Sequence, residues 1–220
     1  ANSPITESDY NQLLPHFPLN PMLATVKSAA LQGIEAVPVL VEVNSGESGD
    51  PRLIMVGLPD TAVKESVGRV FSALAKSGFR KPQTRTTINF APGDLKKEGP
   101  MYDLPIALGI LESTGQMSAS GGLERFTIAG QLSLSGAVRA IRGGLAFAIQ
   151  AQAKGQLGVI LPVESAREAA FVRGIEVYGV ETLDQAKRFL EGKLQLTRFN
   201  RSSLLDQKTE PTGLDFLDVK

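Results

Sequence analysis

Apolar runs separated by polar breaks divide residues 23–192 into predicted strands and helices. Residues 24–31 and 36–43 are largely apolar and rich in β-branched side chains, and the second run partly alternates with polar positions, as a half-buried strand does. Residues 44–51 have the composition of a turn or longer loop, and residues 53–56 that of a short strand. This beginning predicts two or three antiparallel strands.

One long helix is predicted after the third strand. Asp60 can cap its first turn, because a carboxylate accepts the free N–H groups there. Gly78 can end it in the left-handed conformation. The apolar residues that recur at helical spacing and form one stripe are Val63, Val67, Val70, Phe71 and Leu74.

A second helix is predicted to end at Thr114-Gly115, with Pro105 in its first turn, where the missing N–H costs nothing. Asp103 or Leu104 is the expected cap. The expected buried face consists of Ile106, Ala107, Ile110 and Leu111.

The remaining chain continues to alternate. An alanine-rich helix is predicted after Gly143-Gly144 and, being apolar over most of its surface, is expected to be buried. Thr182 and Gln185 form a capping box for a last helix that ends near Gly192. The other predicted strands are 86–91, 126–130, 137–141 (joined to 126–130 across 132–136), 157–161 and 176–180; the alanine-rich helix covers 145–154, and the other predicted helix is 164–172. Strand and helix alternation with an antiparallel beginning predicts an α/β (α+β) two-layer sandwich.

Composition removes several kinds of chemistry. The 220 residues contain no cysteine, which excludes disulfides, thiolate catalysis and Cys-based zinc sites. The single histidine, His16, excludes a His-rich metal site and disfavours a Ser-His-Asp triad. Twenty-three basic residues balance 23 acidic ones, which argues against a free-standing nucleic-acid binder. With no apolar run of about 18–20 residues and no signal-peptide pattern, we expect a cytoplasmic protein without membrane contact.

We expect three regions along the chain. Residues 1–21 are predicted to be a flexible N-terminal extension, with Met22 as a candidate natural start, and residues 22–193 a folded domain. Residues 194–220 are predicted to be a polar linker and the beginning of a further domain that the sequence does not complete.

Motif searches for catalysis are negative. The sequence has no G-x-x-x-x-G-K-[ST], so the chain is not expected to hydrolyse ATP alone, and it has neither G-x-G-x-x-G after a strand nor G-x-S-x-G.

Charged residues in the loop before the second helix leave two questions open. Asp94, Glu98 and Asp103 could include a hydrolytic pair, although capping and loop anchoring suit their positions at turns better. Lys96 and Lys97 could bind an anion beside the helix N-terminus or form a solvated pair. The basic connector at residues 80–85 is a solvated loop or a phosphate contact, and the former is the simpler interpretation.

Several long motifs resemble the Mg-chelatase-like AAA+ ATPases, the ComM/YifB family. They are Val-Gly-Leu-Pro-Asp at 56–60, Ala-Val-Lys-Glu-Ser at 62–66, the run 89–100 (NFAPGDLKKEGP), Asp-Leu-Pro-Ile-Ala at 103–107, the run 130–136 (GQLSLSG), Arg139, Arg142-Gly143, Leu161-Pro162 and Glu164. Gln131 departs from the family, which usually has Glu there. Residues 214–220 resemble the lead-in to the ATPase module of that family, so ATP and Mg²⁺ are expected in that missing module rather than in this fragment.

The resemblance implies the Lon-protease-like fold of the ribosomal S5 domain 2-like group, with a left-handed βαβ crossover. Proteases of that fold use a Ser-Lys dyad. Here the serine position falls on Met101 and the lysine position on Ala146, or on Leu145 or Phe147 if displaced by one. None of these side chains can attack or accept a proton, so proteolysis is not expected.

Three functions compete. The first is a domain of a hexameric, ring-forming DNA motor of the branch-migration or helicase type, associated with natural transformation, that helps assemble the ring or grip DNA. Its candidate DNA contacts are Arg69, Arg80, Lys81, Arg85, Lys96 and Lys97. The second is a scaffold that recruits a protein for a chelatase-like motor. The third is a peptidase with a displaced nucleophile, Ser113 or Ser66. The motif residues that we single out as a candidate site are Asp60, Lys64, Glu65, Asn89, Asp94, Lys96, Lys97, Glu98, Gly99 and Asp103.

Overall fold

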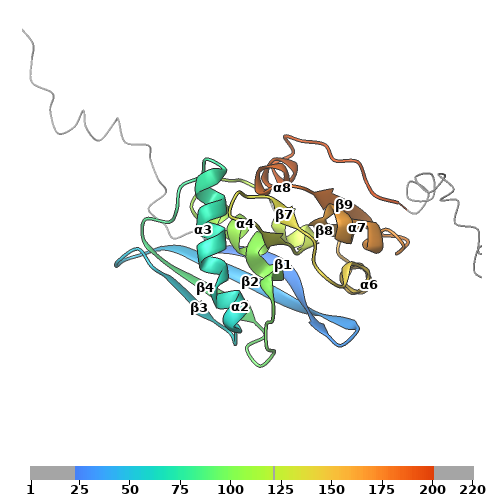
Figure 1. Ribbon diagram of the computed structural model, residues 1–220, viewed down its shortest axis with the longest axis horizontal. Helices are drawn as coiled ribbons and strands as arrows, with labels where there is room; N and C mark the ends of the chain where they lie inside the picture. The colour runs from blue at the N-terminus through green and yellow to red at the C-terminus, as the bar shows by residue number, and fades with distance from the viewer. Residues whose placement is uncertain (1–22, 121, 201–220) are drawn as a thin grey trace, which may run out of the picture.

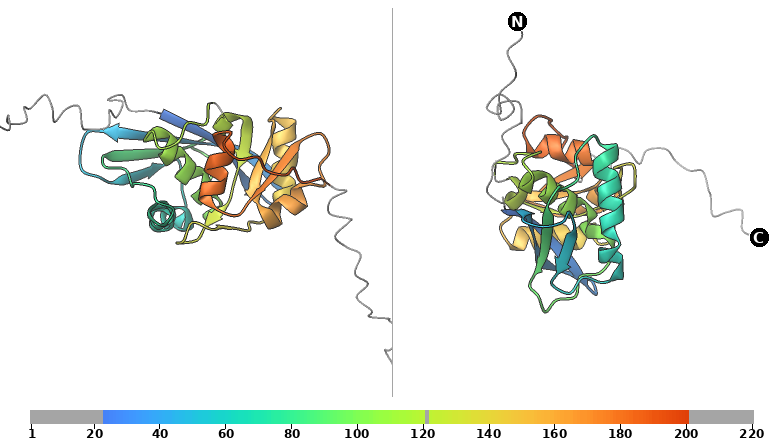
Figure 2. Two further views of the ribbon diagram at one scale, coloured as in Figure 1. Left: turned by 90° about the horizontal axis from the view of Figure 1, so that it is seen from above. Right: turned by 90° about the vertical axis from the view of Figure 1, so that its left-hand side faces the viewer.

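The computed structural model describes residues 23–120 and 122–200 and has a mixed α/β architecture (Figure 1). A four-stranded sheet and a three-stranded parallel sheet lie side by side along the long axis (Figure 2). The elements are β1 (Leu23–Gln32), β2 (Glu35–Glu47), β3 (Leu53–Val56), α2 (Thr61–Lys64), α3 (Ser66–Lys76), β4 (Arg85–Ala91), a 3₁₀ turn (Pro100–Tyr102), α4 (Asp103–Ser113), α5 (Gly122–Arg125), β5 (Phe126–Ile128), β6 (Gln131–Leu132), β7 (Val138–Arg139), α6 (Gly144–Ala153), β8 (Gly158–Pro162), α7 (Val163–Ala169), β9 (Glu176–Val180) and α8 (Leu183–Leu190).

The four-stranded sheet has the order β1-β2-β4-β3. β2 pairs antiparallel with both β1 and β4, whereas β3 lies parallel to β4. The predicted antiparallel beginning therefore holds for β1 and β2 but not for β3. The loop predicted at 44–51 is also shorter, because β2 continues through a bulge between Ser45 and Glu47 and keeps its pairing with β4.

The helix predicted after Asp60 is broken into α2 and α3 at Glu65, which has a helical backbone but separates the two segments. Both end signals are confirmed. The Asp60 side chain accepts a hydrogen bond from the Val63 N–H at 2.7 Å. Gly78 has φ +81°, and the next N–H, of Phe79, donates back to the Leu74 carbonyl at 2.9 Å.

Helix α4 is the centre of the main core. The predicted face is buried, but so are residues 103–111 in general, because the sheet lies on one side of α4 and α3 and α8 lie on others. A Cβ at Gly109 would lie 2.6 Å from the side chain of Val43, so this glycine lets the helix approach β2 closely. Pro105 lies in the first turn as predicted. The predicted cap is wrong: Tyr102 holds the N-cap position without a side-chain bond, and Asp103 is already helical.

The parallel sheet has the order β5-β8-β9 and is covered on both faces. Val159 and Leu161 of β8 face a core with α6 and α7, whereas Ile160 faces the core that contains α4 and α8. The two-layer description therefore does not fit the three-stranded sheet. The predicted pairing of 126–130 with 137–141 is wrong, because β5 joins β8 and the short hairpin is β6 with β7.

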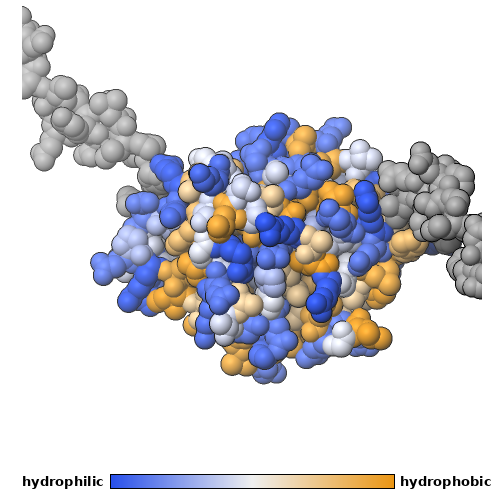
Figure 3. Space-filling view, in the orientation of Figure 1, coloured by the Kyte–Doolittle hydropathy of each residue, from blue (hydrophilic) through white to orange (hydrophobic). Residues whose placement is uncertain are grey.

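Helix α6 is less buried than its composition predicts. Phe147, Ala148 and Ala151 are buried, but Leu145 and Ile149 are 45% and 52% exposed on its outer side. On the face shown in Figure 3, hydrophobic residues are scattered among hydrophilic ones rather than gathered in one large patch. The helix predicted to reach residue 172 ends at Ala169.

The last helix forms as predicted. Thr182 caps α8 by accepting from the Gln185 N–H at 3.1 Å, and the Gln185 side chain accepts in turn from the Glu181 N–H. Within the region predicted as a linker, Phe199 donates its N–H to the Val177 carbonyl at 2.8 Å and packs beside β9. The predicted N-terminal extension, residues 1–21, and residues 201–220 of the predicted linker and further domain lie outside the described residues. In the part of the chain that the structure describes, no helix is long and apolar enough to cross a membrane.

Candidate functional site

Two motifs far apart in sequence interlock through their backbones. The Lys97 N–H donates to the Leu58 carbonyl at 3.1 Å, and the Asp60 N–H donates to the Lys97 carbonyl at 3.0 Å. Gly57 makes this close packing possible: it has φ +92°, and a Cβ there would lie 2.1 Å from the Phe90 carbonyl oxygen. The start of α2 and the loop after β4 are therefore one structural unit.

The Asp60 carboxylate fastens the same unit at a second point. One oxygen caps α2, and the other accepts a hydrogen bond from the Gly99 N–H at 3.3 Å. Gly99 has φ +81°, a conformation that glycine adopts without strain. Asp60 thus couples the beginning of a helix to the Gly99-Pro100 turn.

Lys97 is a buried structural residue. Its side chain is fully buried, and its ammonium donates to the carbonyl oxygens of Phe90, at 3.1 Å, and of Pro92. Burial lowers the pKa of Lys97. Neither interpretation of a lysine pair therefore holds for Lys97, because it is neither solvated nor exposed to an anion. Lys96 is exposed and pairs with Glu98 at 2.6 Å, a hydrogen bond that raises the pKa of Lys96.

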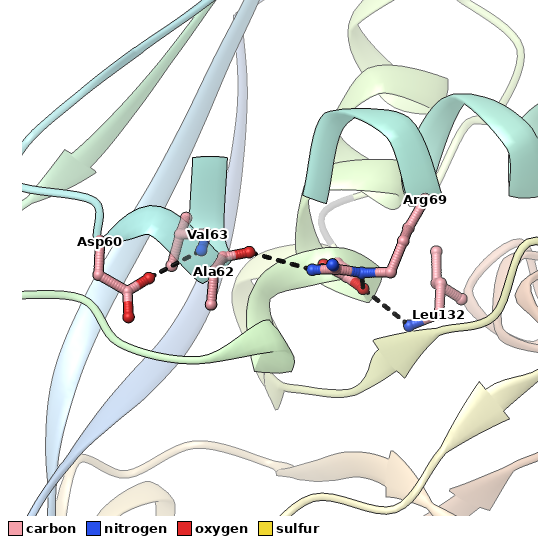
Figure 4. Close-up of polar contacts among 6 residues, drawn as sticks. Asp60, Ala62, Val63, Arg69 and Leu132 are labelled. Atoms are coloured by element: carbon pink, nitrogen blue, oxygen red, sulfur yellow. Dashed lines mark hydrogen bonds and ion pairs between the residues drawn. The ribbon is translucent and has the colours of Figure 1, made fainter. Parts of the chain in front are cut away.

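Asp103 joins three elements instead of capping α4. Its fully buried carboxylate accepts two hydrogen bonds from Arg69, at 2.7 and 3.0 Å, and one from the Leu132 N–H at 3.1 Å. Arg69 also donates to the Ala62 carbonyl at 3.1 Å, so it reaches from α3 to α2 (Figure 4). Burial raises the pKa of the Asp103 carboxyl, whereas the bonds from Arg69 and Leu132 act in the opposite direction.

The other motif residues lie around this unit. Asn89 on β4 donates to the carboxylate of Glu42 on β2 at 2.7 Å. Lys64, Glu65 and Asp94 are exposed.

A pocket of about 580 Å³ opens where the motifs converge, and we call it the Met101 pocket. The five stretches that line it are separate in sequence, and the last of them, Ala140–Arg142, leads directly into Gly143. The lining residues are Leu31, Asp60, Glu98, Gly99, Pro100, Met101, Gln131, Ala140, Ile141 and Arg142. Asp60, Glu98, Gly99 and Met101 were predicted from the sequence, and Pro100, Gln131 and Arg142 were parts of the matching motifs. Leu31 and Ile141, which look like ordinary core positions in the sequence, were missed.

The lining of the Met101 pocket includes no serine, threonine, lysine or histidine, and its two carboxylates, Asp60 and Glu98, are engaged in hydrogen bonds. Met101 lines the pocket where the Gly-Pro turn ends, but Ala146 does not line it. Ser66 and Ser113 are buried and lie outside the lining. The Ser113 hydroxyl is also engaged, since it lies 2.8 Å from the Ser45 hydroxyl.

The candidate DNA-contact residues do not form one surface. Arg69 and Lys97 bind inside the fold, as described above, and Lys96 pairs beside the Met101 pocket. Arg85 pairs with Glu47 at 3.2 Å. The backbone of Arg80 exchanges hydrogen bonds with the side chain of Gln116.

Lys81 lies at a second, smaller pocket of about 320 Å³, which Arg52, Phe71 and Thr84 also line. The Lys81 ammonium is 5.5 Å from the centre of the Phe71 ring. Arg52 was not among the predicted site residues, because it follows a proline in what reads as an ordinary loop. We call Arg52, Lys81 and Phe71 the basic pocket.

The sequence that forms most of this mixed α/β fold, including most of its motif loops, matches a family model. Residues 41–165, more than half of the chain, match the family described as subunit ChlI of Mg-chelatase. The chain belongs to this Mg-chelatase-like family and, within it, to the group that includes YifB and ComM.

Three curated relatives show the extent of the similarity. The YifB protein of Salmonella typhimurium is 41% identical over 198 residues, which cover 90% of this chain and 38% of the relative. YifB of Escherichia coli is 39% identical over 80% of this chain and 34% of the relative. The competence protein ComM of Haemophilus influenzae is 40% identical over 90% of this chain and 38% of the relative. The chain thus spans less than two fifths of the length of the relatives it matches.

Proposed function

We propose that this chain is a non-catalytic N-terminal domain of a Mg-chelatase-like AAA+ ATPase that processes DNA. The family match and the similarity to a competence protein support this proposal. In the full-length protein, the following module would bind ATP and Mg²⁺ and would assemble a hexameric ring, and this domain would support the ring or contact DNA. The fold proposed for the domain is the Lon-protease-like one, with β3, α3 and β4 as the left-handed crossover.

The observation that carries the non-catalytic part of the proposal is the composition of the Met101 pocket. It lies at the Gly99-Pro100 turn, where the proteases of the proposed fold place their serine, yet it presents a thioether there. A serine-reactive fluorophosphonate probe tests this directly. We expect no labelling of the chain, whereas labelling that disappears in Ser66→Ala or Ser113→Ala would overturn the proposal.

The basic pocket is the best-placed DNA contact among the described residues. Lys81 and Arg52 line one hollow, and the ring of Phe71 beside them offers an apolar surface for a base. Phosphate neutralisation by lysine and arginine gives an affinity that falls with salt, with a slope of about 0.9 per phosphate contacted on duplex DNA.

The test compares full-length Arg52→Gln/Lys81→Gln with a matched control, Arg125→Gln/Arg173→Gln, which removes two exposed arginines elsewhere. DNA affinity is measured by fluorescence anisotropy over a range of salt concentrations. We expect the salt slope of the first variant to fall by about two, one phosphate contact per cation, and that of the control to stay unchanged. Equal salt slopes for the two variants would refute the proposal that the basic pocket contacts DNA.

The second candidate function is a scaffold that recruits a protein to the motor. The Met101 pocket favours it, because a hollow without a serine or lysine, and with its carboxylates already engaged, suits binding rather than reaction. An ATPase rate of the full-length protein that rises with a protein partner, and not with branched DNA, would decide for this function.

A further inference from the structure

Arg142 and Gln131 are the polar side chains of the Met101 pocket that have no side-chain partner among the described residues, and Arg142 is the charged one of the two. Within residues 23–120 and 122–200, neither Arg142 nor the neighbouring Arg139 takes part in an ion pair, a side-chain hydrogen bond or a ring contact, and both are exposed. The carboxylates of the pocket are engaged, Asp60 by two backbone N–H groups and Glu98 by Lys96. A ligand would therefore meet one unpaired cation.

The wall beside this cation is apolar. Leu31, Met101 and Ile141 are each only partly buried, packing against the cores with one side. The other side of each of these three side chains lines the pocket. A volume of about 580 Å³ lies within the range of ligand pockets. The complementary ligand is an extended segment that carries a large apolar side chain close to a carboxylate.

This sequence contains such a segment beyond the described residues. Residues 214–218, Leu-Asp-Phe-Leu-Asp, place Phe216 and Asp218 two positions apart, so both point to the same side of an extended chain. At the other end of the chain, residues 10–22 contain no carboxylate, and Ile5 is the apolar residue two positions before the carboxylate of Glu7, without an aromatic ring.

The last described residues lie beside α7, and α7 contacts the pocket wall. Phe199 packs beside Gly179 and the backbone of Val163 at the start of α7. Two residues further along α7, the Ser165 hydroxyl donates to the Ile141 carbonyl at 2.9 Å and accepts from the Ile141 N–H at 3.0 Å. Ile141 is part of the pocket wall. Residues 201–213 can span about 40 Å when extended, at about 3.3 Å each, which is ample for this return.

We propose that residues 214–218 dock into the Met101 pocket of their own chain, with Phe216 against the apolar wall and Asp218 paired with Arg142. The pocket would then hold the segment that leads toward the next module and fix its direction. This inference goes beyond the proposed function, since it requires neither DNA nor a ring.

The sequence contains no cysteine, so an introduced cysteine is the single attachment point for a label. It contains four methionines, which give few signals to observe. A nitroxide is attached to the single cysteine of Lys220→Cys, and the methionine ε-methyl groups are observed by NMR in the 220-residue chain. We expect the Met101 signal to be lost with the oxidised label and restored on its reduction. Met117, beyond the other end of α4, is the internal control and is expected to keep its signal.

Variants then test the contacts. Arg142→Gln and Asp218→Asn each remove a charge-assisted hydrogen bond, and we expect a roughly tenfold lower docking constant and a recovered Met101 signal. Arg173→Gln is the matched control, because the Arg173 backbone lies beside Gln152 at the opposite end of α6. Arg142 is exposed, so its removal should leave the thermal unfolding unchanged.

An unaffected Met101 signal in the labelled chain would overturn the proposal, as would equal effects of Arg142→Gln and Arg173→Gln. A mixture of labelled, NMR-silent chains with unlabelled, NMR-visible chains separates the two possible sources of the segment. Loss of the Met101 signal in that mixture would show docking between copies and would refute docking within one chain.

Discussion

Removal of Arg69 tests one fully buried charge of the fold, the Asp103 carboxylate. Arg69→Met keeps most of the length of the side chain but leaves the Asp103 carboxylate, which is fully buried, with the Leu132 N–H as its remaining bond. Breaking a buried ion pair from one side costs about 3–5 kcal/mol. Because the Arg69 side chain is 21% exposed, some of its attraction is already screened, and we expect about 3 kcal/mol.

The assay is urea unfolding followed by circular dichroism, since the chain has no tryptophan. Asp103→Asn and the double variant complete a thermodynamic cycle. We expect the double variant to be less destabilised than the sum of the single ones, with a coupling of about 2 kcal/mol, because the second change removes the unpaired charge. A loss below about 0.5 kcal/mol for Arg69→Met, or strict additivity, would refute the assignment of Asp103 as a buried, ionised anchor.

The pH dependence of Arg69→Met gives an independent check. Burial already raises the pKa of Asp103 in the folded protein, and the loss of its cation raises it further. The folded state then holds a proton at a pH at which the unfolded chain has released it. Stability is therefore lost as pH rises through the folded-state pKa, and the deficit of Arg69→Met should shrink as pH falls toward the unfolded-state pKa. If the stability deficit of Arg69→Met grew as the pH fell, this predicted direction of the pH dependence would be refuted.

Two further predictions concern the interlocked motifs. Lys97→Met should lower the free energy of unfolding in urea by about 1–3 kcal/mol, because the Phe90 and Pro92 carbonyls lose their donor. The same variant should leave the salt dependence of DNA affinity unchanged. A changed salt slope would show that Lys97 contacts DNA and would contradict its assignment as a buried structural residue. Gly57→Ala should lower stability far more than Gly33→Ala, since both have positive φ but only Gly57 would place a Cβ against backbone, 2.1 Å from the Phe90 oxygen; equal losses would show that conformation alone, and not close packing, requires glycine at position 57.

Local signals in the sequence were sufficient where a single segment decides the outcome. The Asp60 cap, the Gly78 stop and the Thr182 cap are each made by residues a few positions apart, and all three formed as predicted. The pairing of strands was less predictable, because it depends on partners far away: β3 reads as the continuation of an antiparallel meander, yet it lies parallel to β4 after a helical crossover.

The roles of charged residues were the least predictable part of the site. In the sequence Lys96 and Lys97 are equivalent neighbours, but the backbone pairing of Lys97 with Leu58 turns its side chain inward while Lys96 remains in solvent. Asp103 stands where a cap would stand, and its true partner, Arg69, is 34 residues earlier. Composition and spacing do not show such a partner, because it depends on how α3 packs on α4.

Some charged residues are bonded inside the fold and others are exposed at a pocket, and only variants of the second kind test function separately from folding. Asp60, Lys97 and Asp103 hold the walls of the Met101 pocket together by bonds to backbone groups or to Arg69, so variants of these residues report on folding first. Among the described residues, Arg142 lies on the same pocket without such a bond, and Lys81 lies on the basic pocket with its ammonium beside the Phe71 ring. Their removal costs little stability, and a change in binding can then be read as a change in contact. A charge-removal variant that includes Lys97 would confuse the two, which is why the DNA test uses Arg52 and Lys81 and the docking test uses Arg142.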